Sequence, residues 1–96
     1  MIEVRQTEVF TRWLSALHDA HAAKRVVERV YRLSLGNPGQ HRVLKAGVCE
    51  MKIDYGPGYR VYYTRRGDVL VILLCGGDKS TQAADIKTAS RLAAEV

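Results

Sequence analysis

The stretch that decides the fold is CEMKIDYGPGYRVYY, residues 49–63. Apolar and polar residues alternate over its first seven positions, a pattern typical of a β-strand with two different faces. The Gly-Pro-Gly run at 56–58 interrupts the alternation, as expected of a tight reversal. A second strand then runs from about Tyr59 to Arg65. The stretch therefore predicts a β-hairpin with one apolar and one polar face.

A three-residue loop at 56–58 would set the register of this hairpin. It pairs Asp54 with Arg60, Lys52 with Tyr62, and Glu50 with Thr64. Because cross-strand neighbours share one side of a sheet, these six side chains form one polar surface. The intervening apolar residues then face the helices: Met51, Ile53, Val61 and Tyr63. An ordinary solvated face with an Asp54–Arg60 ion pair is the alternative to a functional surface.

On the N-terminal side, the sequence predicts a short strand at residues 2–5 and two helices. Thr7 is expected to cap the first helix, whose apolar face consists of Phe10, Trp13, Leu14 and Leu17. The second helix follows a break at residues 18–19 and ends at the GNPG run, 36–39. Its expected buried stripe is Ala23, Val26, Val27, Val30 and Leu33. So short a break predicts an antiparallel helical hairpin.

On the C-terminal side, VLVILLC at residues 69–75 is apolar throughout, as expected of a central strand covered on both faces. Gly76 and Gly77 are expected to end this strand, and a last helix begins near Ser80. The order β-α-α-β-β-β-α predicts an α+β fold in one domain, residues 1–96. The helices are expected on one face of a mostly antiparallel sheet.

The chain is basic, with 15 Lys and Arg against 10 Asp and Glu, which gives a net charge of +5. This excess favours a polyanionic partner, chiefly nucleic acid, although a merely basic surface explains it too. Part of it forms a basic ridge on the second helix: Lys24, Arg25, Arg29 and Arg32. The two cysteines, Cys49 and Cys75, match no zinc or redox motif. Without a signal peptide or a membrane-length apolar run, we expect a soluble, cytoplasmic protein with no membrane partner.

Four stretches make the chain resemble a known family: FTRWL (10–14), RLSLGNPG (32–39), CEMKIDYGPGYRVYY (49–63) and LLCGGDKSTQAADI (73–86). They are similar to RelE/ParE-superfamily toxins, in particular to the HigB-like "addiction module killer protein" group. The resemblance implies the toxin of a type II toxin–antitoxin module. Its activity would be ribosome-dependent cleavage of mRNA, without metal or cofactor. A helix-turn-helix, HigA-like antitoxin would neutralise it and bind operator DNA together with it.

RNA cleavage by a ribose 2′-OH needs a base, cations for the phosphate charge and a proton donor. Arg60 offers two parallel donors to a phosphate and matches the family's strand arginine, so it is the first candidate. Lys79 matches the lysine after the central strand, as phosphate ligand or proton donor. Glu50 and Lys52 are rival candidates for the base. Further RNA contacts are assigned to Tyr62, by stacking or by orienting a phosphate, to Arg65 and Arg66, and to the basic ridge.

The chain departs from the family at the proton donor. Several relatives carry a histidine or tyrosine near the C-terminus, and the last helix here has neither. His18, His21 and His41 are expected on the surface, away from the sheet site, so Lys79 takes the donor role by default. Two other readings stay open. One is a ParE-like inhibitor of DNA gyrase, and the other is a non-catalytic, antitoxin-binding module.

Overall fold

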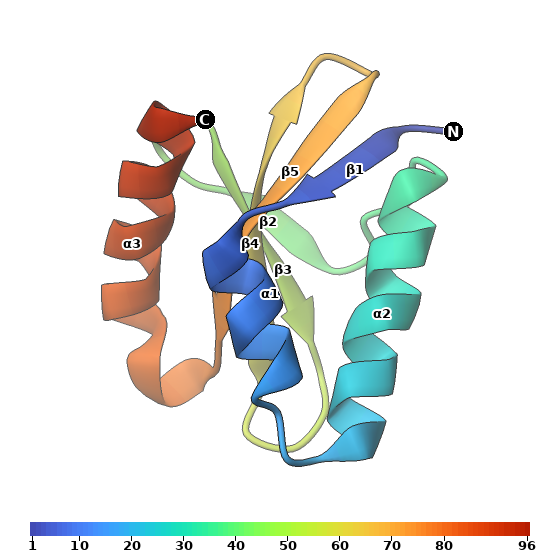
Figure 1. Ribbon diagram of the computed structural model, residues 1–96, viewed down its shortest axis with the longest axis vertical. Coiled ribbons are helices and arrows are strands. Elements are labelled where there is room, and N and C mark those ends of the chain that lie inside the picture. The colour runs from blue at the N-terminus through green and yellow to red at the C-terminus, as the bar shows by residue number, and fades with distance from the viewer.

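A five-stranded sheet forms the centre of the structure, a computed structural model that describes residues 1–96 (Figure 1). The elements in chain order are β1 (Glu3–Gln6), α1 (Glu8–Ser15), α2 (Ala20–Ser34), β2 (His41–Val43), β3 (Val48–Ile53), β4 (Tyr59–Arg66), β5 (Leu70–Gly77), a short 3₁₀ turn η1 (Lys79–Thr81) and α3 (Gln82–Glu95). The strand order is β1-β5-β4-β3-β2, with β1 parallel to β5 and all other neighbours antiparallel. The predicted α+β fold is confirmed. No helix has both the length and the apolar composition needed to cross a membrane.

The helices cover both faces of the sheet, so the expectation that they share one face is wrong. In Figure 1, α1 and α2 run in opposite directions on one side, and α3 lies on the other. The first side holds a core of ten buried residues: Ile2, Phe10, Val26, Leu33, Met51, Ile53, Val61, Tyr63, Val71 and Leu73. The α3 side holds a smaller one: Val48, Tyr62, Leu74, Cys75, Ala89 and Leu92. The uninterrupted apolar sequence of β5 follows from this arrangement, since both of its faces are covered.

The first helix begins at its predicted cap, Thr7, and the second follows the predicted break at residues 18–19. The Thr7 hydroxyl accepts a hydrogen bond from the Phe10 amide at 3.1 Å and donates one to the Leu74 carbonyl at 2.5 Å, which joins α1 to β5. Asp19 caps α2. Val26 and Leu33 are buried as predicted, but Val27 is 54% exposed and does not belong to the buried stripe. Successive helical residues point about 100° apart, so a side chain next to Val26 leaves the core.

The hairpin has a longer loop than predicted. Lys52 pairs with Arg60, Glu50 with Tyr62 and Val48 with Thr64, so the connection spans residues 54–58 and the predicted pairs are wrong. Gly56 and Gly58 both have positive φ, and the Gly58 amide donates to the Tyr55 carbonyl, which closes the wider turn. The register therefore differs from the predicted one by two residues, and because strand alternation has a period of two, the same side chains still share one face. Only Asp54 leaves it.

The end of β5 also differs from expectation, because Gly76 and Gly77 are part of the strand. A Cβ on Gly76 would lie 2.3 Å from the Trp13 ring, and one on Gly77 would lie 1.8 Å from Asp85 Oδ2. Glycine is therefore required where α1 and the start of α3 approach the strand, and not to end it. The short edge strand β2 was not predicted, because its three exposed residues carry no apolar alternation.

Candidate functional site

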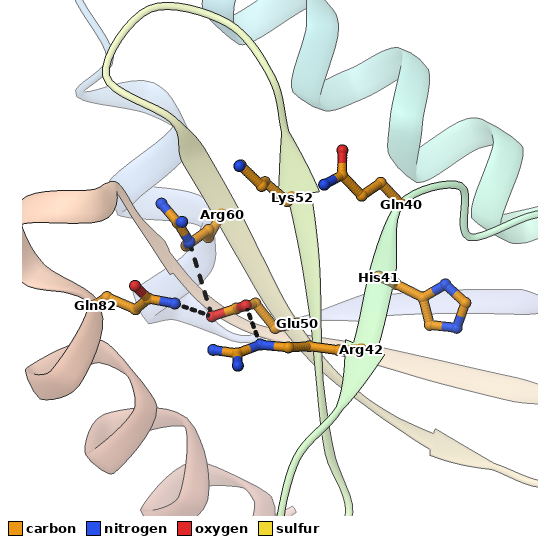
Figure 2. A pocket seen from close by; sticks show the side chains of 7 residues that line it. All are labelled: Gln40, His41, Arg42, Glu50, Lys52, Arg60 and Gln82. Atoms are coloured by element: carbon orange, nitrogen blue, oxygen red, sulfur yellow. Dashed lines mark hydrogen bonds and ion pairs between the residues drawn. The ribbon is translucent and has the colours of Figure 1, made fainter.

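A polar cavity of about 360 Å³ opens on the α3 side of the sheet. It lies among β2, β3, β4 and the first residue of α3 (Figure 2). None of its lining residues is hydrophobic: Gln40, His41, Arg42, Glu50, Lys52, Arg60 and Gln82. The cavity brings together three of the four predicted catalytic residues, namely Glu50, Lys52 and Arg60. With three cations around one carboxylate, it suits an anionic ligand.

Glu50 is the centre of the hydrogen-bond network in this cavity, and its residue is only 4% exposed. Oε1 accepts from Arg42 Nε at 2.7 Å, while Oε2 accepts from the Tyr62 hydroxyl at 3.0 Å and Gln82 Nε2 at 2.9 Å. Burial raises the pKa of Glu50, but the hydrogen bonds from Arg42, Gln82 and Tyr62 outweigh it and hold this pKa below its ordinary value. A carboxylate so engaged is a weak proton acceptor and a strong anchor.

Arg60 is 7% exposed and points into the cavity, away from α1 and α2 (Figure 2). Nη1 donates to the Gly58 carbonyl at 2.7 Å. Nε lies 3.9 Å from Glu50 Oε2, close enough for an ion pair, yet it is buried without a hydrogen-bond partner. Nη2 has no hydrogen-bond partner either, and unlike Nε it is not closed off from solvent. A phosphate or carboxylate oxygen can accept a charge-assisted hydrogen bond from such a free donor.

The two candidate lysines lie on either side of Arg60. Lys52 is its cross-strand partner, and the ammonium group of Lys52 makes no ion pair or hydrogen bond. Lys79 is exposed and does not line the cavity, but it begins η1 at the same end of the sheet. Its amide donates to the Pro57 carbonyl at 3.4 Å, and a Cβ on Gly58 would lie 3.3 Å from Arg60 Nη1 and 3.9 Å from Lys79 Cβ. Arg60 and Lys79 thus border the same loop residue.

The polar face is not the open surface that the sequence predicted. Tyr62 is completely buried beneath α3, and Thr64 is buried as well. Burial and the hydrogen bond to Glu50 raise the pKa of Tyr62. The ring therefore presents no face on which a nucleobase can stack, and its hydroxyl holds Glu50 instead.

The predicted basic ridge on α2 lies on the opposite side of the sheet and divides into two kinds of residue. Lys24, Arg25 and Arg32 are exposed, and the Arg25 guanidinium lies 4.7 Å from the centre of the Tyr55 ring. Arg29 is half-buried. It donates to the carbonyls of Lys52 at 2.7 Å, Pro38 at 3.1 Å and Gln40 at 3.2 Å. Its guanidinium therefore fixes the segment that leads into β2, and it is not free on the surface.

Arg65 and Arg66 lie at the far end of β4, about 17–20 Å along the strand from Arg60. Arg65 donates to the Gly67 carbonyl and to Asp68, and Arg66 donates to the Val96 carbonyl. The structure therefore does not bring these two residues into the cavity.

Four cavity residues were not predicted as site residues: Gln40, His41, Arg42 and Gln82. Three of them follow the GNPG loop as QHR, a polar tripeptide whose role becomes visible only once β2 is known to pair with β3. His41, expected away from the sheet site, borders the cavity, but its exposed ring points away from Glu50 (Figure 2). Nowhere do three or more His, Cys, Asp or Glu side chains cluster in a way that could hold a metal ion.

The chain is similar to a protein of Haemophilus influenzae whose printed name is "Uncharacterized protein". The two are 47% identical over 95 residues, an alignment that covers 99% of this chain and 96% of that protein. Residues 12–94 match the family described as "Phage derived protein Gp49-like (DUF891)". Because the match covers most of the chain, the protein belongs to the Gp49-like family, which is associated with RelE- and HigB-like toxins of toxin–antitoxin systems.

Proposed function

We propose that the protein is a type II toxin that cleaves mRNA on the ribosome, with the polar cavity as its active site. The observation that carries this proposal is the Arg60 guanidinium, held in a buried position among cations with Nε and Nη2 free of hydrogen bonds. Buried donors without a hydrogen-bond partner are costly unless a ligand completes them. An RNA phosphate has the charge and the oxygens to accept a hydrogen bond from Nη2.

The proposed reaction is an internal transfer at one phosphate. The ribose 2′-oxygen forms a bond to phosphorus and loses its proton to a base. The bond from phosphorus to the 5′-oxygen breaks, and that oxygen takes up a proton. The products are a 2′,3′-cyclic phosphate and a free 5′-hydroxyl, so neither water nor an oxidant is consumed. Negative charge gathers on the phosphate oxygens in between, where Arg60 stabilises it.

Among the candidate bases, the structure favours Lys52 over Glu50. Both oxygens of Glu50 already accept hydrogen bonds, and its lowered pKa reduces its basicity. The side-chain nitrogen of Lys52 is unengaged in the cavity, and it accepts the 2′-OH proton in its neutral amine form. We assign Lys79 as a phosphate ligand or as the proton donor for the 5′-oxygen, since both Lys79 and Arg60 lie next to Gly58. Tyr62 acts indirectly, by holding Glu50.

The remaining assignments concern partners. The exposed cations Lys24, Arg25 and Arg32, and the pair Arg65 and Arg66, contact ribosomal RNA at a distance from the cavity. A cognate antitoxin of the helix-turn-helix, HigA-like type neutralises the protein in the cytoplasm, and the complex binds operator DNA. Arg29 is not included among these contacts, because backbone carbonyls occupy its guanidinium.

The test is Arg60→Lys, which keeps the charge and removes the two parallel donors. Expression of the unaltered protein in a bacterium should stop methionine incorporation before thymidine incorporation, and primer extension should reveal new transcript ends. Arg60→Lys should reduce the cleavage rate by about 10²–10³-fold, the usual cost of one transition-state donor. Arg12→Lys is the matched control, since Arg12 is exposed on α1 and pairs only with Glu8.

Each other outcome contradicts the proposal in a different way. Early loss of thymidine incorporation would support a gyrase inhibitor instead. Unimpaired growth would support a non-catalytic module. Full toxicity of Arg60→Lys, with transcript cleavage unchanged, would remove the cavity from the mechanism.

A further inference from the structure

Arg42 is a second arginine of the cavity, and the proposed reaction does not use it. It lies on β2 opposite Glu50, and its side chain is 57% exposed. Nε donates to Glu50 Oε1 at 2.7 Å, while neither terminal nitrogen has a hydrogen-bond partner. Figure 2 shows this side chain reaching from β2 across Glu50 toward the side of the cavity that Gln82 borders.

We propose that Arg42 binds a second phosphate of the RNA, adjacent to the phosphate that Arg60 binds. This inference rests on the proposed function, because it places a neighbouring nucleotide of the same substrate in the same cavity. The ligand is the backbone of single-stranded RNA, recognised by charge and phosphate geometry and not by its bases.

The position of Glu50 explains why one phosphate cannot serve both arginines. Arg42 is bonded to Oε1 of the carboxylate, and Arg60 Nε lies 3.9 Å from Oε2, so the carboxylate stands between the two guanidinium groups. A phosphate placed there would meet a buried negative charge at close range. Each arginine therefore takes a phosphate on the terminal nitrogens that have no hydrogen-bond partner, which are Nη2 of Arg60 and Nη1 and Nη2 of Arg42.

The strand order and register set the separation of the two arginines. β2 and β4 flank β3, and Arg42 lies level with Tyr62, two residues along β4 from Arg60, so the two backbones are roughly 12 Å apart. Glu50 holds both side chains from the strand between them. Because Arg42 is fixed through Nε, less side-chain freedom is lost when its terminal nitrogens bind a ligand. Arg42 is therefore a phosphate-binding group whose side chain is already oriented, and not a mobile surface charge.

The test compares RNA analogues with one and two phosphates. The probes are a 2′-O-methyl dinucleotide and a 2′-O-methyl trinucleotide, which cannot be cleaved because the nucleophile is blocked. We expect the wild-type protein to bind the trinucleotide more tightly in an NMR titration. Arg42→Gln should weaken trinucleotide binding about tenfold, as expected for one charged hydrogen-bonding group, and leave dinucleotide binding unchanged. The slope of log K against log salt should become less steep by about 0.7.

Three further variants separate this role from a general loss of charge or of structure. Arg12→Gln removes the same charge from α1, outside the cavity, and should leave both affinities unchanged. Arg60→Gln should weaken the binding of both oligonucleotides. Arg42→Lys keeps the charge and the fold but not the paired donors, and should recover only part of the lost affinity.

Several results would contradict the proposal that Arg42 binds a second phosphate. Equal wild-type affinity for the two oligonucleotides would do so, and so would a trinucleotide affinity that Arg42→Gln does not change. If transcripts were still cleaved in cells, the proposed function would survive either result. Wild-type protein that bound neither oligonucleotide would overturn the subsite as well. A protein that bound both as expected, yet left transcripts intact, would contradict the nuclease and retain the phosphate sites.

Discussion

The two faces of the β3–β4 hairpin come from the same alternating sequence but are built on different physical principles. The face toward α1 and α2 is apolar, with Met51, Ile53, Val61 and Tyr63 in one core. The face toward α3 carries Glu50, Arg60, Tyr62 and Thr64, all of them buried. Hydrophobic burial stabilises the first face, whereas the second is stable only because its polar groups satisfy one another.

The difference shows how a small domain can hold a charged site. Burial alone would disfavour the charge on Glu50, so three donors from three elements are needed to keep it ionised: Arg42 on β2, Tyr62 on β4 and Gln82 on α3. That network leaves a single orphan, Arg60 Nε. On the α2 side of the sheet, Arg29 Nε is likewise buried without a partner, but backbone carbonyls hold the terminal nitrogens of Arg29.

The largest change in the free energy of unfolding should come from truncating a side chain on the apolar face. Met51→Ala removes a completely buried side chain and should lower the free energy of unfolding by about 2–5 kcal/mol. Val43→Ala, at an exposed position of β2, should change it by less than about 0.5 kcal/mol. Urea denaturation followed by circular dichroism measures both. A small effect of Met51→Ala would mean that the α1–α2 face is not the main core.

A smaller effect, with a different pH dependence, is expected on the polar face. Glu50→Gln should cost about 1–3 kcal/mol near neutral pH, because Arg42 loses its charged partner in a buried network. The pKa of Glu50 is lower in the folded protein than its ordinary 4.5, so the folded state binds fewer protons. The stabilisation is therefore present above about pH 4.5 and is lost as the pH falls through the folded value. Urea midpoints of the two proteins should converge in acid, and a pH-independent difference would contradict this assignment.

The smallest effect is expected from removing one donor of the network. Tyr62→Phe keeps the buried ring and loses the hydroxyl bond to Glu50, so it should cost about 0.5–1.5 kcal/mol. With one donor fewer, the pKa of Glu50 should rise, and the acid loss of stability should begin at a higher pH. Thermal unfolding between pH 3 and 7 measures both. Tyr63→Phe is the matched control on the apolar face, because Tyr63 makes no contact with Glu50.

The sequence predicted the apolar face well because strand alternation and helical spacing report directly on burial. Met51, Val61, Phe10 and Leu33 were all expected in the core, and all are there. The hairpin register was missed by two residues because the longer loop depends on two glycines in a left-handed conformation. Alternation has a period of two, so this error kept the correct face and changed only the partners.

The site was predicted only in part, because its assembly depends on tertiary contacts that no local pattern reports. Arg60, Lys52 and Glu50 were found as neighbours on one face. Arg42 was missed with the three-residue strand that carries it, and Gln82 was missed because nothing indicated that α3 would cross to that side. The burial of Tyr62 follows from the same placement of α3. Lys79 and Arg60 both lie beside Gly58, as their positions in the hairpin and after β5 suggested. Their roles are still predictions.

The parallel pairing of β1 with β5 has a consequence for how the protein is made. Glu3 to Gln6 align with Leu70 to Leu73, so the first strand cannot be hydrogen-bonded until β5 has been synthesised. Such long-range pairings form late and slow folding. Gln82, which completes the Glu50 network, is added later still. A nascent chain therefore stays without its finished cavity until the start of α3 has left the ribosome.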